Sequence, residues 1–311
     1  MDNIKVVDNP QYDKDFWSAL RGTPGAINKI VDGRDTSQGS YNLPFVGAGK
    51  VKSARNAESV FRRISTSLSA EQHDFKITVR DTKDLATFVP ENGEIPIYDG
   101  MSDYNELRVG RHKLAVMVKY DSDFIYDASF NFESSLSKRL GENFALAEDK
   151  AFINGTGVDE PIGILNPENG ANVGTETANL SFNDVTSLYL SVDKRYRKHG
   201  TWLMNDETAL ALRKLTDKDG NYLWNHSNDT IFGKPVTISE FMPSIGTGSK
   251  PIAFGDFSYY WILDRKSVSV RPLFEKFAAL NQVAYLAMEF LDGKLIRPDA
   301  IKVIEIKSNE S

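Results

Sequence analysis

The chain has 311 residues, 41% of them hydrophobic and 26% charged, which is typical of a globular protein and not of a disordered one. The formal net charge is −6 and the basic residues are spread in ones and twos, so no basic stripe is available for specific nucleic-acid binding. The absence of cysteine excludes disulfides and thiolate chemistry. The charged N-terminus lacks a signal-peptide core and no run approaches the ~18 apolar residues of a membrane span, so we expect no membrane attachment.

The first 49 residues are punctuated by Gly, Asp, Asn and Ser and contain only one short amphipathic piece, Asp15 to Leu20. Such a segment cannot form a core alone, so we expect an extended arm. Phe16 and Trp17 belong to the amphipathic piece.

Residues 54–68 carry apolar side chains at helical spacing, which predicts a short helix. From 75 to 121 the pattern changes to strand alternation in FKITV and KLAVMVKY, which are separated by a long polar insert from Arg80 to Arg111. Two strands joined by such an insert predict a protruding β-hairpin. Loops of this size usually carry function, here contact with a neighbour, although a surface loop without function is the alternative.

The strongest helical signal runs from Phe130 to Asn154, where apolar residues recur every three or four positions before a Gly. At ~1.5 Å per residue this helix would be about 35 Å long and could serve as a spine. A second helix is predicted from the N-cap Ser181 to Gly200, and a third over residues 206–215. Strands are predicted in TWLMN, KPVTISEF, PIAFGDF, YYWILD, SVSVRP, QVAYLAMEF and AIKVIEIK, and the mixture indicates an α+β fold.

Candidate sites for catalysis, cofactors or metals are few. No two of the four histidines have the spacing of a helical metal pair. The sequence at 217–221 resembles part of a calcium loop, but Asn228 stands where the bidentate Glu would be, which favours a plain turn. Glu142, Glu148 and Asp149 lack partners that would separate their pKa values and are predicted to be solvated. We therefore expect no catalytic, cofactor-binding or metal-binding residue and no enzyme activity.

Phe257, Tyr259, Tyr260 and Trp261 form an aromatic cluster that could stack a base or a sugar. A strand-rich setting without surrounding basic residues favours a place in the core or in an interface. Under the first interpretation the chain would be a monomeric carbohydrate- or peptide-binding module.

Five blocks, in order, resemble the HK-ninety-seven-type major capsid family of tailed bacteriophages. They are the helix from Phe130 running into NGTGVDEPIGIL, followed by WLMNDETALALRKLTDKDGNYLW, IFGKPVTISEFMP, PIAFGDFSYYWILDRKSVSVRP and NQVAYLAMEFLDGKLIRPDAIKVIE. Each block is weak alone, and the set is specific because the order is kept as far as Glu305. Upstream, LATFVPENGEIP is similar to the tip of the family's extended loop.

The resemblance implies the α+β phage capsid fold in four parts. These are an N-terminal arm at 1–49, a peripheral domain built from 50–75, 117–172 and 281–311, an extended β-hairpin loop at 76–116, and an axial domain at 173–280. No heptad run precedes Phe16, so the chain resembles a mature form without an N-terminal scaffolding segment, or a branch with a separate scaffold.

The same resemblance implies a function. A major capsid protein self-assembles through pentamers and hexamers into the icosahedral shell around the dsDNA genome of a tailed phage or prophage. The expected partners are the chain itself, scaffolding, portal and maturation protease proteins, and DNA bound without sequence specificity. The expected location is the virion, after assembly in the bacterial host cytoplasm. The runner-up is the shell of an encapsulin-like nanocompartment, which shares the fold and encloses enzymes.

The arm and the extended loop have no core of their own, so their apolar residues are expected to be buried against neighbouring subunits. For Tyr104 and Leu107, packing against the hairpin's own strands is the alternative. DNA contacts would be local ones, such as Arg62 and Arg63. The predicted assembly interface comprises Phe16, Trp17, Phe88, Glu91, Glu94, Ile95, Tyr104 and Leu107.

The family's self-cross-linking member joins a loop Lys to an Asn of a neighbour with the help of a Glu that accepts a proton. The resemblance places Ile95 on the position of that Lys, Asn281 on the acceptor position and Met288 on the position of that Glu. Glu289 is one residue further along a strand and would point to the opposite face. Lys83 is a poor substitute nucleophile because it is far from the loop tip. We expect no covalent cross-link.

Overall fold

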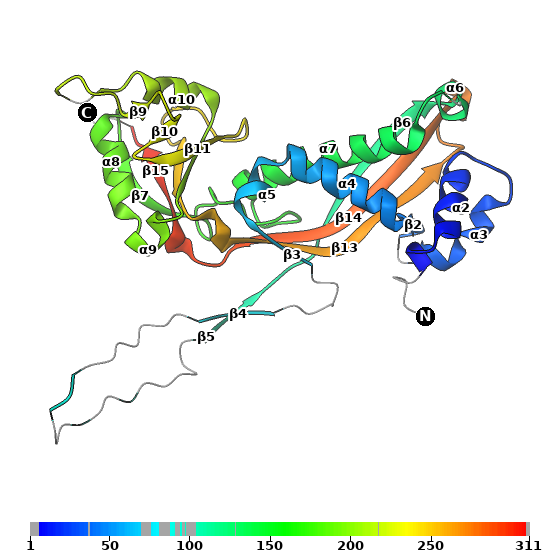
Figure 1. The fold of residues 1–311 in the computed structure, drawn as a ribbon, viewed down its shortest axis with the longest axis horizontal. Helices are drawn as coiled ribbons and strands as arrows, with labels where there is room; N and C mark the ends of the chain where they lie inside the picture. The colour runs from blue at the N-terminus through cyan, green and yellow to red at the C-terminus, as the bar shows by residue number, and fades with distance from the viewer. Residues whose placement is uncertain are drawn as a thin grey trace.

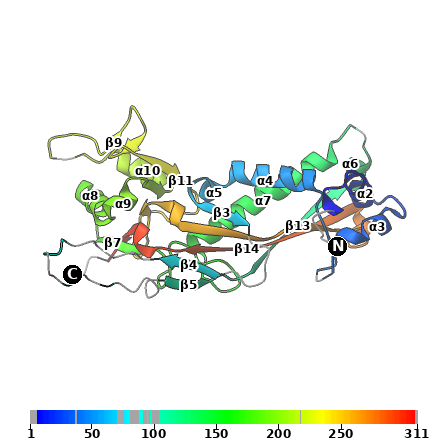
Figure 2. The ribbon, with the colours of Figure 1, turned by 60° about the horizontal axis from the view of Figure 1, so that its bottom comes forward.

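The computed structural model describes residues 6–36, 38–69, 76–80, 88–90, 94, 97, 104–127, 129–216 and 218–308. These residues form an elongated subunit in which a long sheet runs through one part and a second sheet lies at the other end (Figure 1). Helices α4 and α7 lie together along the long sheet in both views (Figure 2). Among the helices of the described ranges, none has the length and apolarity that crossing a membrane requires.

The long sheet has the strand order β1-β2-β13-β14-β6, and β3 pairs in parallel with β13. Its centre is the antiparallel pair of β13 and β14, which have 14 residues each. Its strands are β1 (Arg34–Asp35), β2 (Ser40–Asn42), β3 (Thr66–Ser69), β6 (His112–Asp121), β13 (Tyr260–Leu273) and β14 (Gln282–Leu295). Its helices are α2 (Pro10–Leu20), α3 (Ala26–Lys29), α4 (Phe45–Glu58), α5 (Val60–Ile64), α6 (Ser122–Tyr126) and α7 (Phe132–Asn154), with the short 3-10 turns η1 (Val31–Gly33) and η3 (Ala278–Leu280).

The predicted spine helix is confirmed as α7, which begins two residues later than expected. Asn131 caps it, because its side-chain oxygen accepts a hydrogen bond from the backbone N–H of Ser134 at 3.1 Å. Leu140 is buried in the core that α7 shares with the sheet. Where α7 crosses α4, a Cβ on Gly141 would lie 2.6 Å from the Val51 carbonyl oxygen, so a glycine is needed for the two helices to approach this closely.

The second sheet has the order β7-β15-β12-β8-β11-β10-β9. Helices α8 and α10 contribute apolar side chains to the core on this sheet. Ser181 caps α8 in a reciprocal capping box with Asp184, as the sequence predicted for the start of this helix. The elements are β7 (Asn172–Thr177), α8 (Phe182–Ser191), α9 (Lys194–Arg197), β8 (Thr201–Met204), α10 (Asp206–Arg213), β9 (Trp224–Asn225), β10 (Thr230–Ile231), β11 (Lys234–Ile238), β12 (Ile252–Gly255), η2 (Phe257–Tyr259), η4 (Pro298–Ala300) and β15 (Ile301–Ile306).

A third core joins the two sheets, with buried side chains from α5, α7, β12, β13, β14 and β15. Here the chain passes from β12 to β13 and later returns from β14 to β15. The two connecting segments, residues 256–259 and 296–300, are hydrogen-bonded to each other. The Ile296 N–H donates to the Tyr259 carbonyl and the Asp256 N–H donates to the Ala300 carbonyl, both at 2.9 Å.

The prediction of which two strands form the hairpin was wrong. FKITV contributes β4 (Lys76–Arg80), which pairs antiparallel with β5 (Tyr104–Arg108) inside the presumed insert. KLAVMVKY instead lies in β6, which pairs with β14 along ten residues of the long sheet. The physical reason is burial: Val118 and its alternate neighbours face the core shared with α7, which a free-standing hairpin could not offer.

Other boundaries also differ from the prediction. The helix expected at 54–68 starts earlier, breaks at Ser59, which caps α5, and gives way to β3. The second helix stops at Ser191, with α9 as a separate turn. The two strands predicted in YYWILD and SVSVRP form one strand, β13. It belongs to the long sheet, although the family resemblance assigns residues 173–280 to the axial domain. β15 joins the second sheet although 281–311 had been assigned to the peripheral part.

The N-terminal segment is not an arm without a core. Helix α2 begins after the N-cap Asn9 and places Tyr12, Phe16 and Trp17 against the core of the long sheet. The exposed fraction of Phe16 is 1% and that of Trp17 is 4%. Both residues were predicted to be buried only by a neighbouring chain. That prediction is wrong, because the apolar face of α2 is buried within its own subunit.

Candidate functional site

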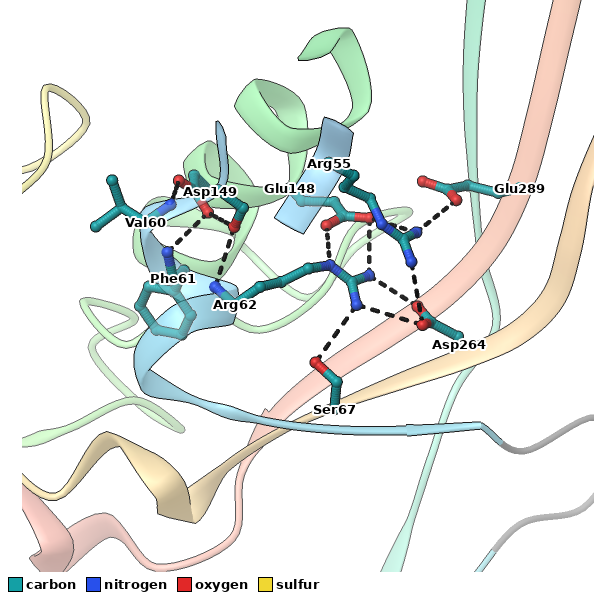
Figure 3. Close-up of polar contacts among 10 residues, drawn as sticks. Arg55, Val60, Phe61, Arg62, Ser67, Glu148, Asp149, Asp264 and Glu289 are labelled. Atoms are coloured by element: carbon teal, nitrogen blue, oxygen red, sulfur yellow. Dashed lines mark hydrogen bonds and ion pairs between the residues drawn. The ribbon is translucent and has the colours of Figure 1, made fainter. Parts of the chain in front are cut away.

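Charged side chains from five elements meet between the helices and the long sheet (Figure 3). Arg55 comes from α4, Arg62 from α5, Glu148 from α7, Asp264 from β13 and Glu289 from β14. Four of them are buried and Asp264 is half-buried. We call these five residues the buried charge cluster.

Arg62 makes a two-pronged contact with Glu148. Its Nε donates to Glu148 Oε2 at 2.5 Å and its Nη2 donates to Glu148 Oε1 at 2.9 Å. The same guanidinium donates to Asp264 Oδ1 at 2.7 Å. Burial acts to lower the pKa of Arg62, but Glu148 and Asp264 outweigh it and raise that pKa. Arg62 is therefore a permanent positive charge that bridges helix α7 and strand β13.

Arg55 contacts all three acids of the cluster. Its Nη1 donates to Glu289 Oε2 at 2.8 Å and lies 3.3 Å from Glu148 Oε1, while its Nη2 donates to Asp264 Oδ2 at 3.2 Å. Burial acts to raise the pKa of Asp264, and the guanidiniums of Arg62 and Arg55 lower it overall. The two arginines thus fasten α4 and α5 to α7 and to both central strands.

A neighbouring acid, Asp149, fixes the start of helix α5. It accepts hydrogen bonds from the Ser59 hydroxyl at 2.5 Å and from the backbone N–H groups of Val60 at 2.7 Å and Phe61 at 3.1 Å. These are N–H groups that a helix cannot satisfy internally. Burial raises the pKa of Asp149, and the three donated hydrogen bonds oppose that effect. Asp149 therefore positions α5, and with it Arg62.

The arrangement is suited to holding elements together. Each arginine is engaged with carboxylates, and the acids face other protein groups. Over the part of the chain that the structure describes, no group of three or more His, Cys, Asp or Glu is placed to hold a metal ion. The aromatic cluster also has a packing role, since Phe257 and Tyr260 are buried in the core between the sheets.

The prediction that Glu148 and Asp149 are solvated was wrong. Both are buried. The signal was available for Glu148, which continues the four-residue spacing of Leu140 and Phe144 on the buried face of α7. Its partners could not be found from the sequence, because Arg55 and Arg62 lie 93 and 86 residues away. The prediction of Arg62 as a DNA contact was also wrong, since Glu148 and Asp264 occupy it.

The predicted assembly residues have different surroundings. Phe88 and Glu94 are exposed. Glu91 and Ile95 lie outside the described residues, as does Lys83. Tyr104 and Leu107 lie in β5, for which the structure describes the backbone pairing with β4. Their contacts with a neighbouring subunit stay a prediction.

A comparison with family models adds the deciding observation, because the model of the phage capsid family matches residues 39–306. The chain belongs to the phage capsid family. The capsid of an empty GTA particle is 28% identical, with a TM-score of 0.65 over 81% of this chain and 90% of that one. The capsid of the native GTA particle is also 28% identical, with a TM-score of 0.64 over 80% of this chain and 91% of that one. A comparison with curated proteins found no match.

Membership of the phage capsid family confirms the resemblance inferred from the five sequence blocks. The fold is also similar to that of a solved chain from Gordonia phage Cozz. That chain is 15% identical, and the TM-score is 0.56 over 81% of this chain and 87% of that one. The α+β architecture is the HK-ninety-seven-type capsid fold. The protein is a bacteriophage capsid protein that forms a shell with copies of itself and is located in the virion.

Two of the residues that the sequence comparison aligned with the cross-linking residues of one family member, and the neighbouring Glu289, lie in the described part of the chain. Asn281 is exposed and has a left-handed backbone, with its Nδ2 3.4 Å from Asp123 Oδ1. Met288 is buried opposite Ala115. Glu289 points to the other side of β14, where it binds Arg55. The alternation predicted for these two neighbours is confirmed, and Glu289 is committed to the buried charge cluster.

We expect mature shells to be held together without isopeptide bonds. Particles boiled in detergent and reductant should run on a denaturing gel as one band near the chain mass of 34.8 kDa. The reason is that the resemblance places Ile95 on the position of the nucleophilic Lys and Met288 on the position of the proton-accepting Glu, so both groups would be missing. A ladder from dimers to hexamers that survives this treatment would show the prediction to be wrong, and Asn281→Ala would then test whether Asn281 is the acceptor.

Proposed function

We propose that this protein is the major head protein of a tailed phage or prophage and that its subunits form pentamers and hexamers that close into an icosahedral shell around dsDNA. Scaffolding, portal and maturation protease proteins would act with it in the bacterial host cytoplasm. Membership of the phage capsid family and the 28% identity to GTA particle capsids support this proposal.

The observation that carries the proposal is the pairing of β4 with β5. These strands pair with each other and with no other strand of the described part of the chain. They lie outside the outline of both sheets (Figure 1). A two-stranded ribbon is marginally stable in water, so it gains stability when it lies on another surface. A neighbouring subunit supplies that surface in a shell.

Exposed apolar side chains at the two ends of the subunit also support assembly. At the long-sheet end, Phe124, Tyr126 and Leu280 are 53%, 68% and 64% exposed. On the second sheet's side, Leu190 and Leu210 are 59% and 56% exposed. Different surfaces at the two ends suit heterologous contacts, which close into rings when the rotation between subunits allows it.

The proposed role requires no enzyme activity and no sequence-specific binding of DNA. The net charge of −6 disfavours a tight complex with duplex DNA. The guanidiniums of Arg55 and Arg62 are occupied by acids of the same subunit. We therefore propose that the genome is enclosed by the shell and touches it at scattered basic residues of the exposed surface.

The test is to replace residues 81–103 with a two-residue Gly–Ser turn that keeps β4 and β5. We expect soluble subunits with unchanged circular dichroism that no longer close shells, as judged by size-exclusion chromatography and negative-stain microscopy. A control that replaces the segment with Gly and Ser at its full length separates loop length from loop side chains. Normal shells from both variants would overturn the proposed role of the loop. Shells filled with enzymes and lacking DNA would favour an encapsulin-like compartment.

A further inference from the structure

The buried charge cluster does not balance if all its groups are ionised. Two guanidiniums, Arg55 and Arg62, face three carboxyl groups, Glu148, Asp264 and Glu289. The formal sum is therefore −1, at a place where four of the five side chains are shielded from water. An uncompensated buried charge costs several kcal/mol, on the order of what holds a whole domain together. The exposed Lys52 acts on the half-buried Asp264 and is not among the groups that act on Glu289, so the buried acids still need a counter-charge.

Of the two buried glutamates in the cluster, Glu289 receives fewer hydrogen bonds from the arginines than Glu148 does. Its side chain is 3% exposed, and its Oε2 accepts one hydrogen bond from Arg55. Its other oxygen, Oε1, is buried and has no hydrogen-bond partner among the residues that the structure describes. Glu148, in contrast, receives two hydrogen bonds from Arg62 and a contact from Arg55. A bare carboxylate oxygen in such a place is costly, whereas a protonated one becomes a donor.

The groups around Glu289 come from every element packed there. Arg55 on α4 and Arg62 on α5 favour its ionised form, and Glu148 on α7 opposes it. Asp264 on β13 also interacts with both arginines, and Lys52 of α4 helps them to lower its pKa. Burial, first, and the neighbouring Glu148 raise the pKa of Glu289 well above its usual range, and the arginines only partly offset this. A metal cation would be repelled by the two guanidiniums, so a proton is the better counter-charge.

We propose that the buried charge cluster is a proton-binding site, in which Glu289 carries one proton in the folded subunit and donates it in a hydrogen bond to Glu148. One bound proton makes the cluster neutral, with two positive and two negative charges. It also gives the unpartnered Oε1 a role as donor. The site lies where α4, α5 and α7 meet the central strands of the long sheet, so loss of the proton would weaken the attachment of the helices to the sheet.

The proposal fixes the sign of a pH dependence. A carboxyl group whose pKa is raised in the folded state binds its proton more tightly there than in the unfolded chain. Its contribution to stability is fully present below the pKa of an unfolded glutamate and is lost as the pH rises through the folded pKa of Glu289. Alkaline conditions therefore loosen this junction through Glu289, whereas acid weakens it through Asp264, whose lowered pKa means that its ion pairs are lost as the pH falls.

The direct test is infrared spectroscopy of the full-length protein at neutral pH, where a protonated carboxyl gives a C=O band distinct from that of carboxylates. We expect the band in the wild type, its loss in Glu289→Gln, and its retention in the exposed control Glu275→Gln. Retention in Glu289→Gln would overturn the assignment, and Asp149→Asn would then show whether Asp149 holds the proton. Absence of the band from the wild type would overturn the proposal outright.

A second measurement begins with the wild type alone. Raising the pH of the wild type should remove the infrared band and lower the thermal stability over the same pH range. In Glu289→Gln, which imitates the protonated acid, the pH dependence of stability in this range should be smaller by about one proton released per chain on unfolding. Identical slopes in the two proteins would refute the site.

Discussion

Replacing Arg62 with alanine is expected to destabilise the free subunit by about 3–5 kcal/mol, which is typical when one partner of a buried ion pair is removed. The variant leaves Glu148 with a single 3.3 Å contact to Arg55, and Asp264 loses its 2.7 Å hydrogen bond. Helix α5 would lose its ionic links to Glu148 of α7 and to Asp264 of β13 and would keep its hydrogen bonds to Asp149. Denaturant unfolding of subunits, followed by tryptophan fluorescence, measures the effect.

The adjacent Arg63 provides a matched control. It has the same charge and lies on the same helix but is exposed, so Arg63→Ala should change the stability by less than about 0.5 kcal/mol. Arg62→Lys keeps the charge and removes the two-pronged contact with Glu148, and we expect an intermediate loss. Equal stability of Arg62→Ala and Arg63→Ala would contradict a structural role of the buried charge cluster.

Replacing Phe16 with alanine is expected to cost about 3–5 kcal/mol in the free subunit, because a large aromatic side chain leaves the core. Phe16 packs edge-on against Trp17 with ring centroids 5.3 Å apart, and the Trp17 ring lies 6.3 Å from that of Phe132 on α7. Near the end of α2, the Leu20 carbonyl accepts a hydrogen bond from the Tyr285 hydroxyl at 2.8 Å. The measurement is chemical unfolding of unassembled subunits.

The experiment also separates two views of the N-terminal segment. If the segment found its place only on a neighbouring subunit, Phe16→Ala would leave the free subunit unchanged and lower only the yield of shells. Val31→Ala is the control, since Val31 belongs to the same N-terminal segment and is 50% exposed. We expect that control to unfold like the wild type.

The sequence predicted those elements whose signal is local. Helix α7 was found because its apolar residues recur at helical spacing over six turns and Gly155 marks its end, whereas the cap at Asn131 was not recognised. The start of α8 was found from its cap, Ser181. The order of sequence blocks was enough for the family because each block corresponds to a strand or helix that the fold keeps in that order.

Long-range choices were not predictable in the same way. The residues YNELR show little strand character, and β5 forms because the chain brings them opposite Lys76–Arg80. The N-terminal segment was judged coreless because its apolar residues are few, yet α7 and β14 supply the rest of the core. The buried charge cluster joins five elements, and charged residues in a sequence do not reveal which of them lose contact with water.

The crossings between the two sheets determine how the subunit can bend. The chain goes from one sheet to the other along residues 155–171, 256–259 and 296–300. The last two segments are hydrogen-bonded to each other, and the Tyr260 hydroxyl donates to the Ile162 carbonyl of the first at 2.8 Å. A hinge at this place would have to break all these bonds together. We therefore expect bending between the two sheets to be restricted, so that contacts between subunits contribute to the curvature of a shell.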